Sequence, residues 1–93
     1  MYNEVVLVGR IIDIEEKGND TINVIVEVSK SADDRDYIPA TLKGNLASNT
    51  LAYCKKGNCI GIKGKLATNE DKQLIMVAEK VTFLSSQEEK EQK

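Results

Sequence analysis

The chain has 93 residues, enough for one domain with a single modest core but too few for a core plus an elaborate catalytic annex. It contains no histidine and no tryptophan, and its formal net charge is -2. The absence of histidine removes the commonest general base and the commonest metal ligand. Because the overall charge is near neutral, any surface for a nucleic-acid partner has to be a local patch.

Residues 5–14 and 21–30 predict the first two strands. The segment 5–14 (VVLVGRIIDI) is apolar and β-branched, which predicts a long strand that is buried on both faces at first and bends at Gly9. The segment 21–30 (TINVIVEVSK) alternates between apolar and polar residues, as expected of a half-buried strand in a hairpin with the first. Its inward positions are Ile22, Val24, Val26 and Val28.

A polar loop at 31–36 leads into a third predicted strand at 37–43 (YIPATLK). Pro39 cannot donate a ladder hydrogen bond, so it marks an edge, a bulge or a break in the pairing of this strand. The inward positions are Ile38, Ala40 and Leu42.

A single helix is predicted after the third strand. From Asn45, a residue type that caps helices, apolar side chains recur at helical spacing, and two lysines and Gly57 form the expected stop. The spacing predicts that Tyr53 packs into the core beside two leucines of the helix.

Two more strands are predicted at 58–66 (NCIGIKGKL) and 73–84 (QLIMVAEKVTFL), separated by a polar loop. Three strands, one helix and two strands is the element order of the OB-fold, a five-stranded Greek-key barrel that binds oligonucleotides or oligosaccharides. We therefore predict an all-β OB-fold domain at 1–85 with the helix between strands three and four. A mostly antiparallel sheet in another arrangement would have the same periodicity and is the alternative at this point. Residues 86–93 are predicted to form a disordered charged tail.

The segment around Cys54 and Cys59 carries no convincing chemistry of its own. A zinc site needs about four ligands, and the chain offers two cysteines and no histidine. The neighbouring glycines follow a helix and precede a strand, the reverse of a phosphate-binding loop. We expect buried thiols, no metal or other cofactor, and no enzymatic activity, because no base, nucleophile and orienting group converge.

Three segments resemble bacterial single-stranded DNA-binding proteins, and together they cover about residues 3–84. They are NEVVLVGRI at the start, DYIPATLKGNLASNTLAYCKKGNCIGIKGKL in the middle and EKVTFL at the end. The resemblance implies an OB-fold, assembly into homodimers or homotetramers through the first strand, and DNA binding by stacked aromatic rings and basic side chains. By position, Tyr37 falls where the family often has a stacking tryptophan, and Lys43 where many members have another aromatic.

Two departures from the family pattern change the expectation. The segments SKSADDRD and LATNEDK carry no aromatic residue where family members commonly stack further bases, so we expect weaker DNA binding, or binding that depends more on charge. The end of the chain, QEEKEQK, lacks the acidic, hydrophobic tip that recruits replication and repair proteins in the family. This second departure moves the chain toward short relatives such as primosomal replication protein N.

Most candidate DNA-binding residues are lysines and arginines. The two others are an aromatic residue, Tyr37, and a hydroxyl residue, Thr41. Lys63 and Lys65 are two apart on one strand and share a face, and Lys43 shares a face with Tyr37 and Thr41. The other reading of these positions is a solvated lysine face with an incidental tyrosine. Weaker candidates are Arg10, Lys30, Arg35 and Lys72, among which Arg35 is expected to be neutralised by its two aspartate neighbours.

The sequence and the resemblance together predict a protein that binds single-stranded DNA largely without sequence preference in replication, recombination or repair. The alternative is a protein-interaction module of a primosome-like replication assembly with weak DNA binding. RNA or an oligosaccharide is a third possible ligand class for this fold. The expected partners are single-stranded DNA, further copies of the chain and replication proteins. No membrane is involved, and no signal peptide is recognisable, so the expected location is the cytoplasm.

Overall fold

The structure, a computed structural model, describes residues 2–84, so the predicted tail lies outside the described residues. These residues form five strands and one helix. In chain order the elements are β1 (Val5–Gly18), β2 (Thr21–Ser31), β3 (Asp34–Lys43), α1 (Asn45–Tyr53), β4 (Cys59–Thr68) and β5 (Leu74–Phe83).

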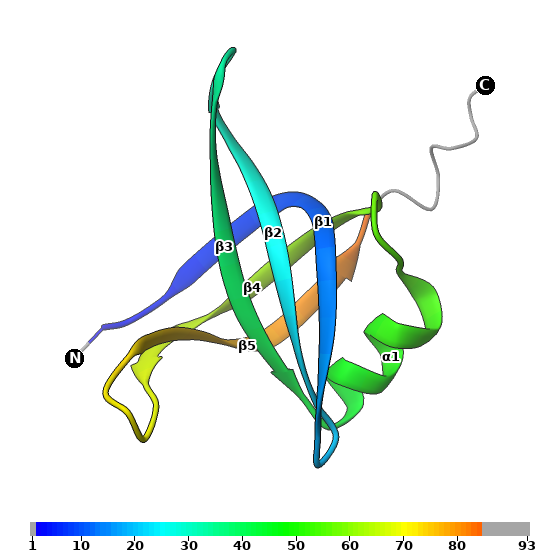
Figure 1. The fold of residues 1–93 in the computed structure, drawn as a ribbon, viewed down its shortest axis with the longest axis vertical. Helices are drawn as coiled ribbons and strands as arrows, with labels where there is room; N and C mark the ends of the chain where they lie inside the picture. The colour runs from blue at the N-terminus through cyan, green and yellow to red at the C-terminus, as the bar shows by residue number, and fades with distance from the viewer. Residues whose placement is uncertain (1, 85–93) are drawn as a thin grey trace.

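The strands close into a barrel in the order β1-β2-β3-β5-β4, with α1 lying at one end beside the end of β3 (Figure 1). Every pair is antiparallel except β3 with β5, which pair in parallel at two positions only, Ala40 with Met76 and Thr41 with Val77. Pro39 stands immediately before these positions, as expected of a residue at a break in pairing. The fold prediction of a five-stranded OB-fold barrel with one helix between β3 and β4 is confirmed.

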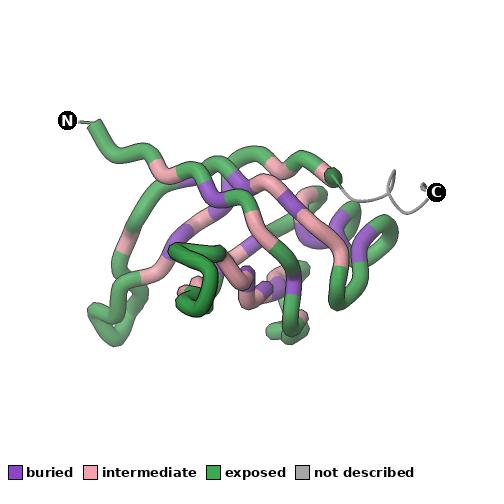
Figure 2. The backbone as a smooth tube through the Cα atoms, turned by 90° about the horizontal axis from the view of Figure 1, so that it is seen from above, coloured by how far each residue is buried: buried purple, intermediate pink, exposed green. Residues whose placement is uncertain are grey.

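The core follows the alternation of the strands. Ile22, Val24 and Val26 of β2 are at most 2% exposed, and the residues between them are only partly buried. The same holds for Ala40 and Leu42 of β3. Figure 2 shows buried positions alternating with more exposed ones along the backbone. The remaining buried side chains of the barrel are Leu7, Ile11, Ile60, Ile62, Met76 and Ala78. The inward positions predicted from the period of two therefore agree with the structure.

Strand β1 serves two partners along its length. Residues 5–10 pair with β4 and residues 10–18 pair with β2, so the strand changes partner at Arg10. Gly9 allows the crossing, because a Cβ atom there would lie 2.2 Å from the carbonyl oxygen of Glu27. The prediction that the start of β1 is buried on both faces is wrong. Val6 and Val8 are 65% and 59% exposed, because no described element covers the outer face of the barrel there.

The hairpin between β2 and β3 is longer than predicted, and the polar loop is shorter. Cross-strand pairing continues to Ser31 and Asp34, so only Ala32 and Asp33 form the turn. Strand pairing depends on backbone hydrogen bonds, so polar segments can pair without an apolar face. Because these residues lack an apolar face, their composition predicted a loop. The resulting arm projects beyond the barrel (Figure 1).

Both predicted ends of α1 need correction. The residue before the helix is Gly44, with a φ of 62°, and Asn45 is the first helical residue rather than the cap. The turn from β3 into the helix requires this left-handed backbone, which glycine supplies. The helix ends at Tyr53, where Cys54 returns to an extended conformation, and Gly57 belongs to the next turn.

The buried face of the helix agrees with the predicted spacing only in part: Thr50 and Cys54 are buried and Leu46 packs against the core, but Leu51 and Tyr53 do not. Ala47 and Thr50 face the core, whereas Tyr53 is 69% exposed and Leu51 is 43% exposed. The prediction that Tyr53 packs in the core is therefore wrong. Small side chains let this short helix approach the barrel closely, and Tyr53 is left outside.

The Thr50 hydroxyl is fully buried and has no hydrogen-bond partner among the described residues. Because an unsatisfied buried hydroxyl is destabilising, we expect Thr50→Val to raise the free energy of unfolding by about 1–2 kcal/mol. Urea denaturation of the two proteins measures the difference. Thr50→Ser, which keeps the hydroxyl and removes a methyl group, is expected to lower stability. A loss of stability in Thr50→Val would mean that the hydroxyl has a partner.

Candidate nucleic-acid interface

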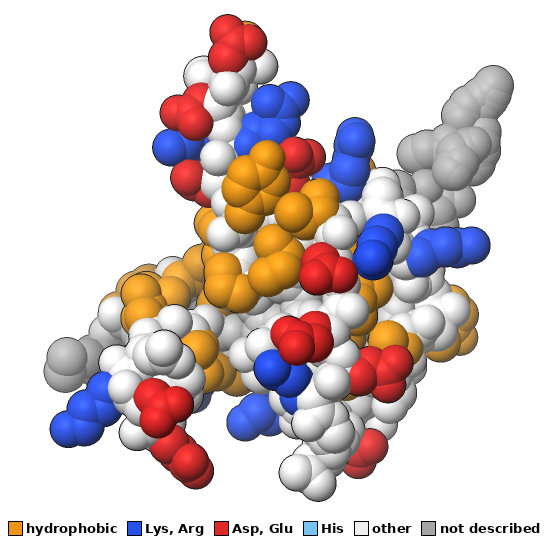
Figure 3. Space-filling model, viewed as in Figure 1, with side chains coloured by type: hydrophobic (Ala, Val, Ile, Leu, Met, Phe, Trp, Pro, Cys, Tyr) orange, Lys and Arg blue, Asp and Glu red, His pale blue; other side chains and the backbone are white. Residues whose placement is uncertain are grey.

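One row of outward positions crosses four strands. Tyr37 of β3 lies opposite Glu27 of β2, Glu27 opposite Arg10 of β1, and Arg10 opposite Cys59 of β4. The Tyr37 ring is 57% exposed, so one face is open to a flat ligand. Figure 3 shows hydrophobic side chains in the middle of the face that β2 and β3 present, with charged side chains around them and on the projecting hairpin.

A cleft of about 260 Å³ beside Tyr37 brings two arginines together. Arg10 and Arg35 both line it, with Glu27 and Ser29. The Arg35 Nε atom lies 3.6 Å from the Glu27 carboxylate. Among the described residues Arg10 makes no ion pair, so its guanidinium is available to an anion. The sequence ranked both arginines as weaker candidates, and only the pairing of the strands places them on one cleft.

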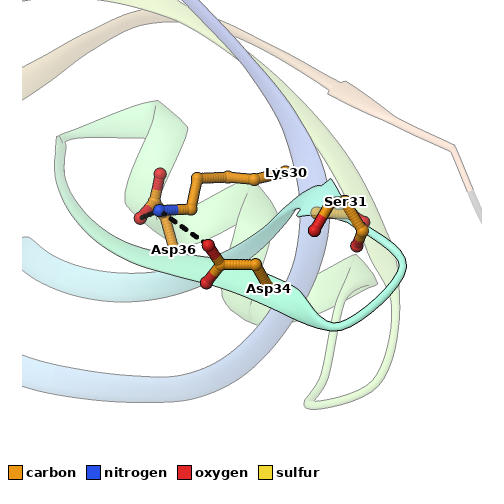
Figure 4. A network of polar contacts seen from close by, with 5 residues as sticks. Lys30, Ser31, Asp34 and Asp36 are labelled. Carbon is orange, nitrogen blue, oxygen red and sulfur yellow. Dashed lines mark hydrogen bonds and ion pairs between the residues drawn. The ribbon is translucent and has the colours of Figure 1, made fainter.

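The carboxylates around the hairpin are paired differently from the prediction. Arg35 contacts Glu27 rather than Asp34 or Asp36. Both aspartates instead contact Lys30, whose Nζ atom is 3.4 Å from Asp34 and 3.2 Å from Asp36 (Figure 4). Hydrogen bonds to Asp36 and Asp34 raise the pKa of Lys30. Two carboxylates thus offset the charge of Lys30, which makes it a poor isolated site for phosphate.

A second row of outward positions crosses β2, β3, β5 and β4. Asn23 lies opposite Thr41, Thr41 opposite Val77, and Val77 opposite Lys65. The Thr41 hydroxyl donates to the Asn23 side chain at 3.0 Å. Lys65 lies 3.9 Å from Glu79, and both side chains are exposed, so this ion pair is weak. The row brings Lys65 to the same outer surface as Thr41, a neighbourhood that the sequence did not predict.

Lys43 lines a hollow of about 720 Å³ beside the loop between β4 and β5. Glu70 and Asp71 of that loop line the same hollow. Lys43 and Lys72 make no ion pair among the described residues. The loop itself is held by Asn69, whose side chain accepts from the backbone amides at 71 and 73. Lys43 is thus an available cation close to two carboxylates.

Lys63 and Lys65 are both exposed on the outward side of β4, as their spacing predicted, because Ile62 and Gly64 are the buried positions beside them. Lys63 is opposite Val6 of β1 and Lys80 of β5, and the pairing of β4 with β5 shifts register after it. Its Nζ atom lies 3.0 Å from Glu4. Hydrogen bonds from the Tyr2 hydroxyl and from Lys63 lower the pKa of Glu4. Lys63 therefore belongs to the outer face of β1, β4 and β5.

That outer face carries a mainly apolar groove with a volume of about 340 Å³. Its exposed apolar members are Val6, Val8 and Leu84. Before Arg10, β1 pairs only with β4, because its pairing with β2 begins at Arg10. We call this surface, with its free strand edge, the β1 face.

The cysteines show no site chemistry. Cys54 is buried, and burial raises the pKa of its thiol, while Cys59 is partly buried. Within residues 2–84 no group of three or more histidine, cysteine, aspartate or glutamate side chains could hold a metal ion.

A closed five-stranded barrel with an exposed ring and arginines on one outer face is a small barrel of the kind that binds oligonucleotides. Comparison with known proteins gives the particular family. The chain belongs to the single-strand binding protein family, whose family model matches residues 2–88. A family described by binding agrees with the expectation that the chain is not an enzyme.

The relatives extend over most of the chain. Single-stranded DNA-binding protein 1 of Clostridium acetobutylicum is 30% identical over an alignment covering 94% of this chain and 97% of that protein. The structure of the second single-stranded DNA-binding protein of Mycobacterium smegmatis has a TM-score of 0.73 at 24% identity, covering 92% of each chain. The dimeric N-terminal domain of PriB from Thermoanaerobacter tencongensis has a TM-score of 0.66 at 24% identity, covering 88% of this chain and 96% of that one. The two structures show the fold.

Residues 2–84 include no helix long and apolar enough to cross a membrane; α1 has nine residues.

Proposed function

We propose that this domain binds single-stranded DNA largely without sequence preference, by stacking a base on Tyr37 and pairing phosphates with Arg10, Lys43 and Lys65. The observation that carries the proposal is the row in which an exposed ring, Tyr37, and an arginine without an ion pair among the described residues, Arg10, lie on one outer face, two strands apart with Glu27 between them. Rings stack on any base and cations pair with any phosphate, so this combination binds strands without reading their sequence. The curated relatives are named for the same activity.

The remaining candidate residues have graded roles in this proposal. Arg35 can pair with a phosphate in the cleft only if its ion pair with Glu27 breaks. Glu27 therefore lowers the affinity of the cleft for phosphate. Lys72 contacts a strand that passes the loop between β4 and β5. The Thr41 hydroxyl already donates to the Asn23 side chain, so it offers a strand only its acceptor oxygen. Lys30 and Lys63 act mainly through long-range attraction, because each is already paired with carboxylates.

The proposal includes a homo-oligomer that forms through the β1 face. Val6 and Val8 expose apolar surface, and the edge of β1 before Arg10 has no strand partner on one side among the described residues. Exposed apolar residues and an unpaired strand edge together favour association with a second strand. A second copy of the chain would cover the apolar residues and pair with the free strand edge.

The proposed place of action is the cytoplasm, because DNA is replicated there in bacteria such as those of the curated relatives.

A titration with unlabelled oligo-dT at two salt concentrations tests the binding. We expect binding at low salt that weakens as salt rises, because phosphate pairing releases counterions. Duplex DNA of the same length is the control and is expected to bind less, since its bases are not free to stack. Absence of oligo-dT binding at low salt would contradict the proposal.

One observation favours the second candidate, a protein-interaction module of a replication assembly. On the outer face of β2 and β3, Tyr37 is the one exposed aromatic among the described residues. A single ring supports weak DNA binding at most. If oligo-dT binding is absent while the purified chain binds a replication protein directly, the second candidate replaces the first.

A further inference from the structure

Tyr53 forms a second exposed aromatic surface, at the end of α1. It is 69% exposed, and its ring centroid lies 5.9 Å from that of Phe83, with the rings tilted by 45°. Phe83 is partly buried at the end of β5 and packs against the core. The Tyr53 ring is thus supported on one side by a ring anchored in the barrel, and its other side is open.

The turn after Tyr53 places cations next to this ring and holds them in position. The Lys55 amide donates to the Asn58 side chain at 2.8 Å, and the Gly57 amide donates to the carbonyl of Ile11 at 2.7 Å. The Ile11 amide in turn donates to the Asn58 carbonyl at 2.9 Å. These bonds dock the turn on β1, beside Arg10. Lys55, on this turn, makes no ion pair among the described residues.

Lys56, the next residue of the turn, lies 3.5 Å from Asp13, and both side chains are well exposed. An ion pair in this setting is worth little and exchanges readily for another anion. The turn therefore offers two cations, one without an ion pair and one weakly paired.

The row that starts at Tyr37 ends beside this surface. It runs through Glu27 and Arg10 to Cys59, and the carbonyl of Cys59 accepts a hydrogen bond from Leu84, the residue after Phe83. Three strand-to-strand steps separate Tyr37 from Cys59, a distance of about 14 Å. That length lies within the span of one barrel, which accommodates about 4–16 nucleotides.

We infer that Tyr53, supported by Phe83, and the cations of the following turn form a second binding site for single-stranded DNA. A strand leaving Tyr37 passes Arg10 and stacks a base on Tyr53, with its phosphate at Lys55. The inference rests on the proposed function and extends its site around the end of the barrel. An open ring next to cations fits a nucleotide better than it fits a protein surface, which would need a larger apolar patch.

The test compares Tyr53→Ala with the unchanged protein in binding oligo-dT of about 16 nucleotides. We expect about tenfold weaker binding, as for the loss of one stacked base. Tyr53→Phe keeps the ring and is expected to bind as the unchanged protein does. Tyr2→Ala is the matched control, because it removes a tyrosine that is 88% exposed and lies in the N-terminal segment.

Photocrosslinking of the unchanged protein to oligo-dT containing 5-iodouracil gives a readout that a structural role would not produce. A crosslink to the peptide that contains Tyr53 supports the inference. Oligo-dT binding that is unchanged in Tyr53→Ala, with no crosslink at that peptide, overturns it and leaves the proposed function standing. If the unchanged protein binds no oligo-dT, both are overturned.

Discussion

Replacing Tyr37 by alanine is expected to weaken the binding of oligo-dT by about tenfold to a hundredfold. A stacked base contributes about 1–3 kcal/mol, and about 1.4 kcal/mol corresponds to a factor of ten in the dissociation constant. The effect is large for this protein because no second exposed ring shares the face of β2 and β3 in the described part of the chain. Fluorescence anisotropy of a labelled oligonucleotide measures the change directly.

The controls for this prediction separate stacking from charge. Tyr37→Phe keeps the ring and is expected to retain most of the affinity. Arg10→Ala with Lys65→Ala removes two of the proposed phosphate contacts, so it should also flatten the dependence of binding on salt. If Tyr37→Ala leaves binding unchanged while the double variant abolishes it, charge alone holds the strand and the proposed role of Tyr37 is wrong.

If the chain assembles through the β1 face as proposed, the combined substitution Val6→Glu and Val8→Glu is expected to convert the proposed oligomer into single chains. It places two carboxylates on the β1 face, where the structure exposes two valines next to a free strand edge. Burying unpaired charges in an interface costs far more than the apolar contact contributes. Light scattering after size-exclusion chromatography gives the mass of the assembly.

Leu74→Glu is the matched control for this variant. Leu74 is 67% exposed, as the valines are, but it lies in a different groove, with Ile38 and Leu66. The control is expected to keep the mass of the unchanged protein. A variant with both valines replaced that still assembles, or an unchanged protein that is already a single chain, would show that the β1 face is not an interface.

The number of surface lysines overestimates how many cations are available to bind phosphate, because several of them form ion pairs. Lys30, Lys63 and Lys65 each lie within 4 Å of a carboxylate, whereas Arg10, Lys43 and Lys72 make no ion pair among the described residues. A phosphate competes with a carboxylate at the first group and meets no competitor at the second. We therefore place the proposed contacts mainly on Arg10 and Lys43, with Lys65 as the most readily released of the paired lysines.

The elements and the inward positions could be predicted because they depend on neighbours in the chain. Ile22, Val24 and Val26 alternate with polar residues, and a strand turns alternate residues to opposite faces whatever its partner is. The resemblance to the family added Tyr37 and the barrel. The ends of the elements could not be predicted as well. The arm of β2 and β3, for example, is paired through backbone groups, which every residue carries whatever its side chain.

The partners of the charged residues could not be predicted in the same way. Arg35 stands between two aspartates in the chain, yet in an extended strand its side chain points away from theirs and toward Glu27 on β2. Tyr53 and Leu51 have the spacing of core residues, but Ala47 and Thr50 face the barrel. In both cases the spacing of residues along the chain is compatible with several side-chain arrangements. The packing against a neighbouring strand or the barrel decides which arrangement forms.

The sequence by itself determined the order of five strands and a helix, the inward positions of β2 and β3 and the presence of one ring at the start of β3. The tertiary structure alone decided that Tyr37, Glu27, Arg10 and Cys59 lie in one row, that Lys63 lies opposite Val6 and Lys80 while Lys65 lies opposite Val77, and that Tyr53 is open. The physical reason is that strand periodicity is a property of neighbouring residues. Register across a closed barrel is decided by the simultaneous pairing of all five strands.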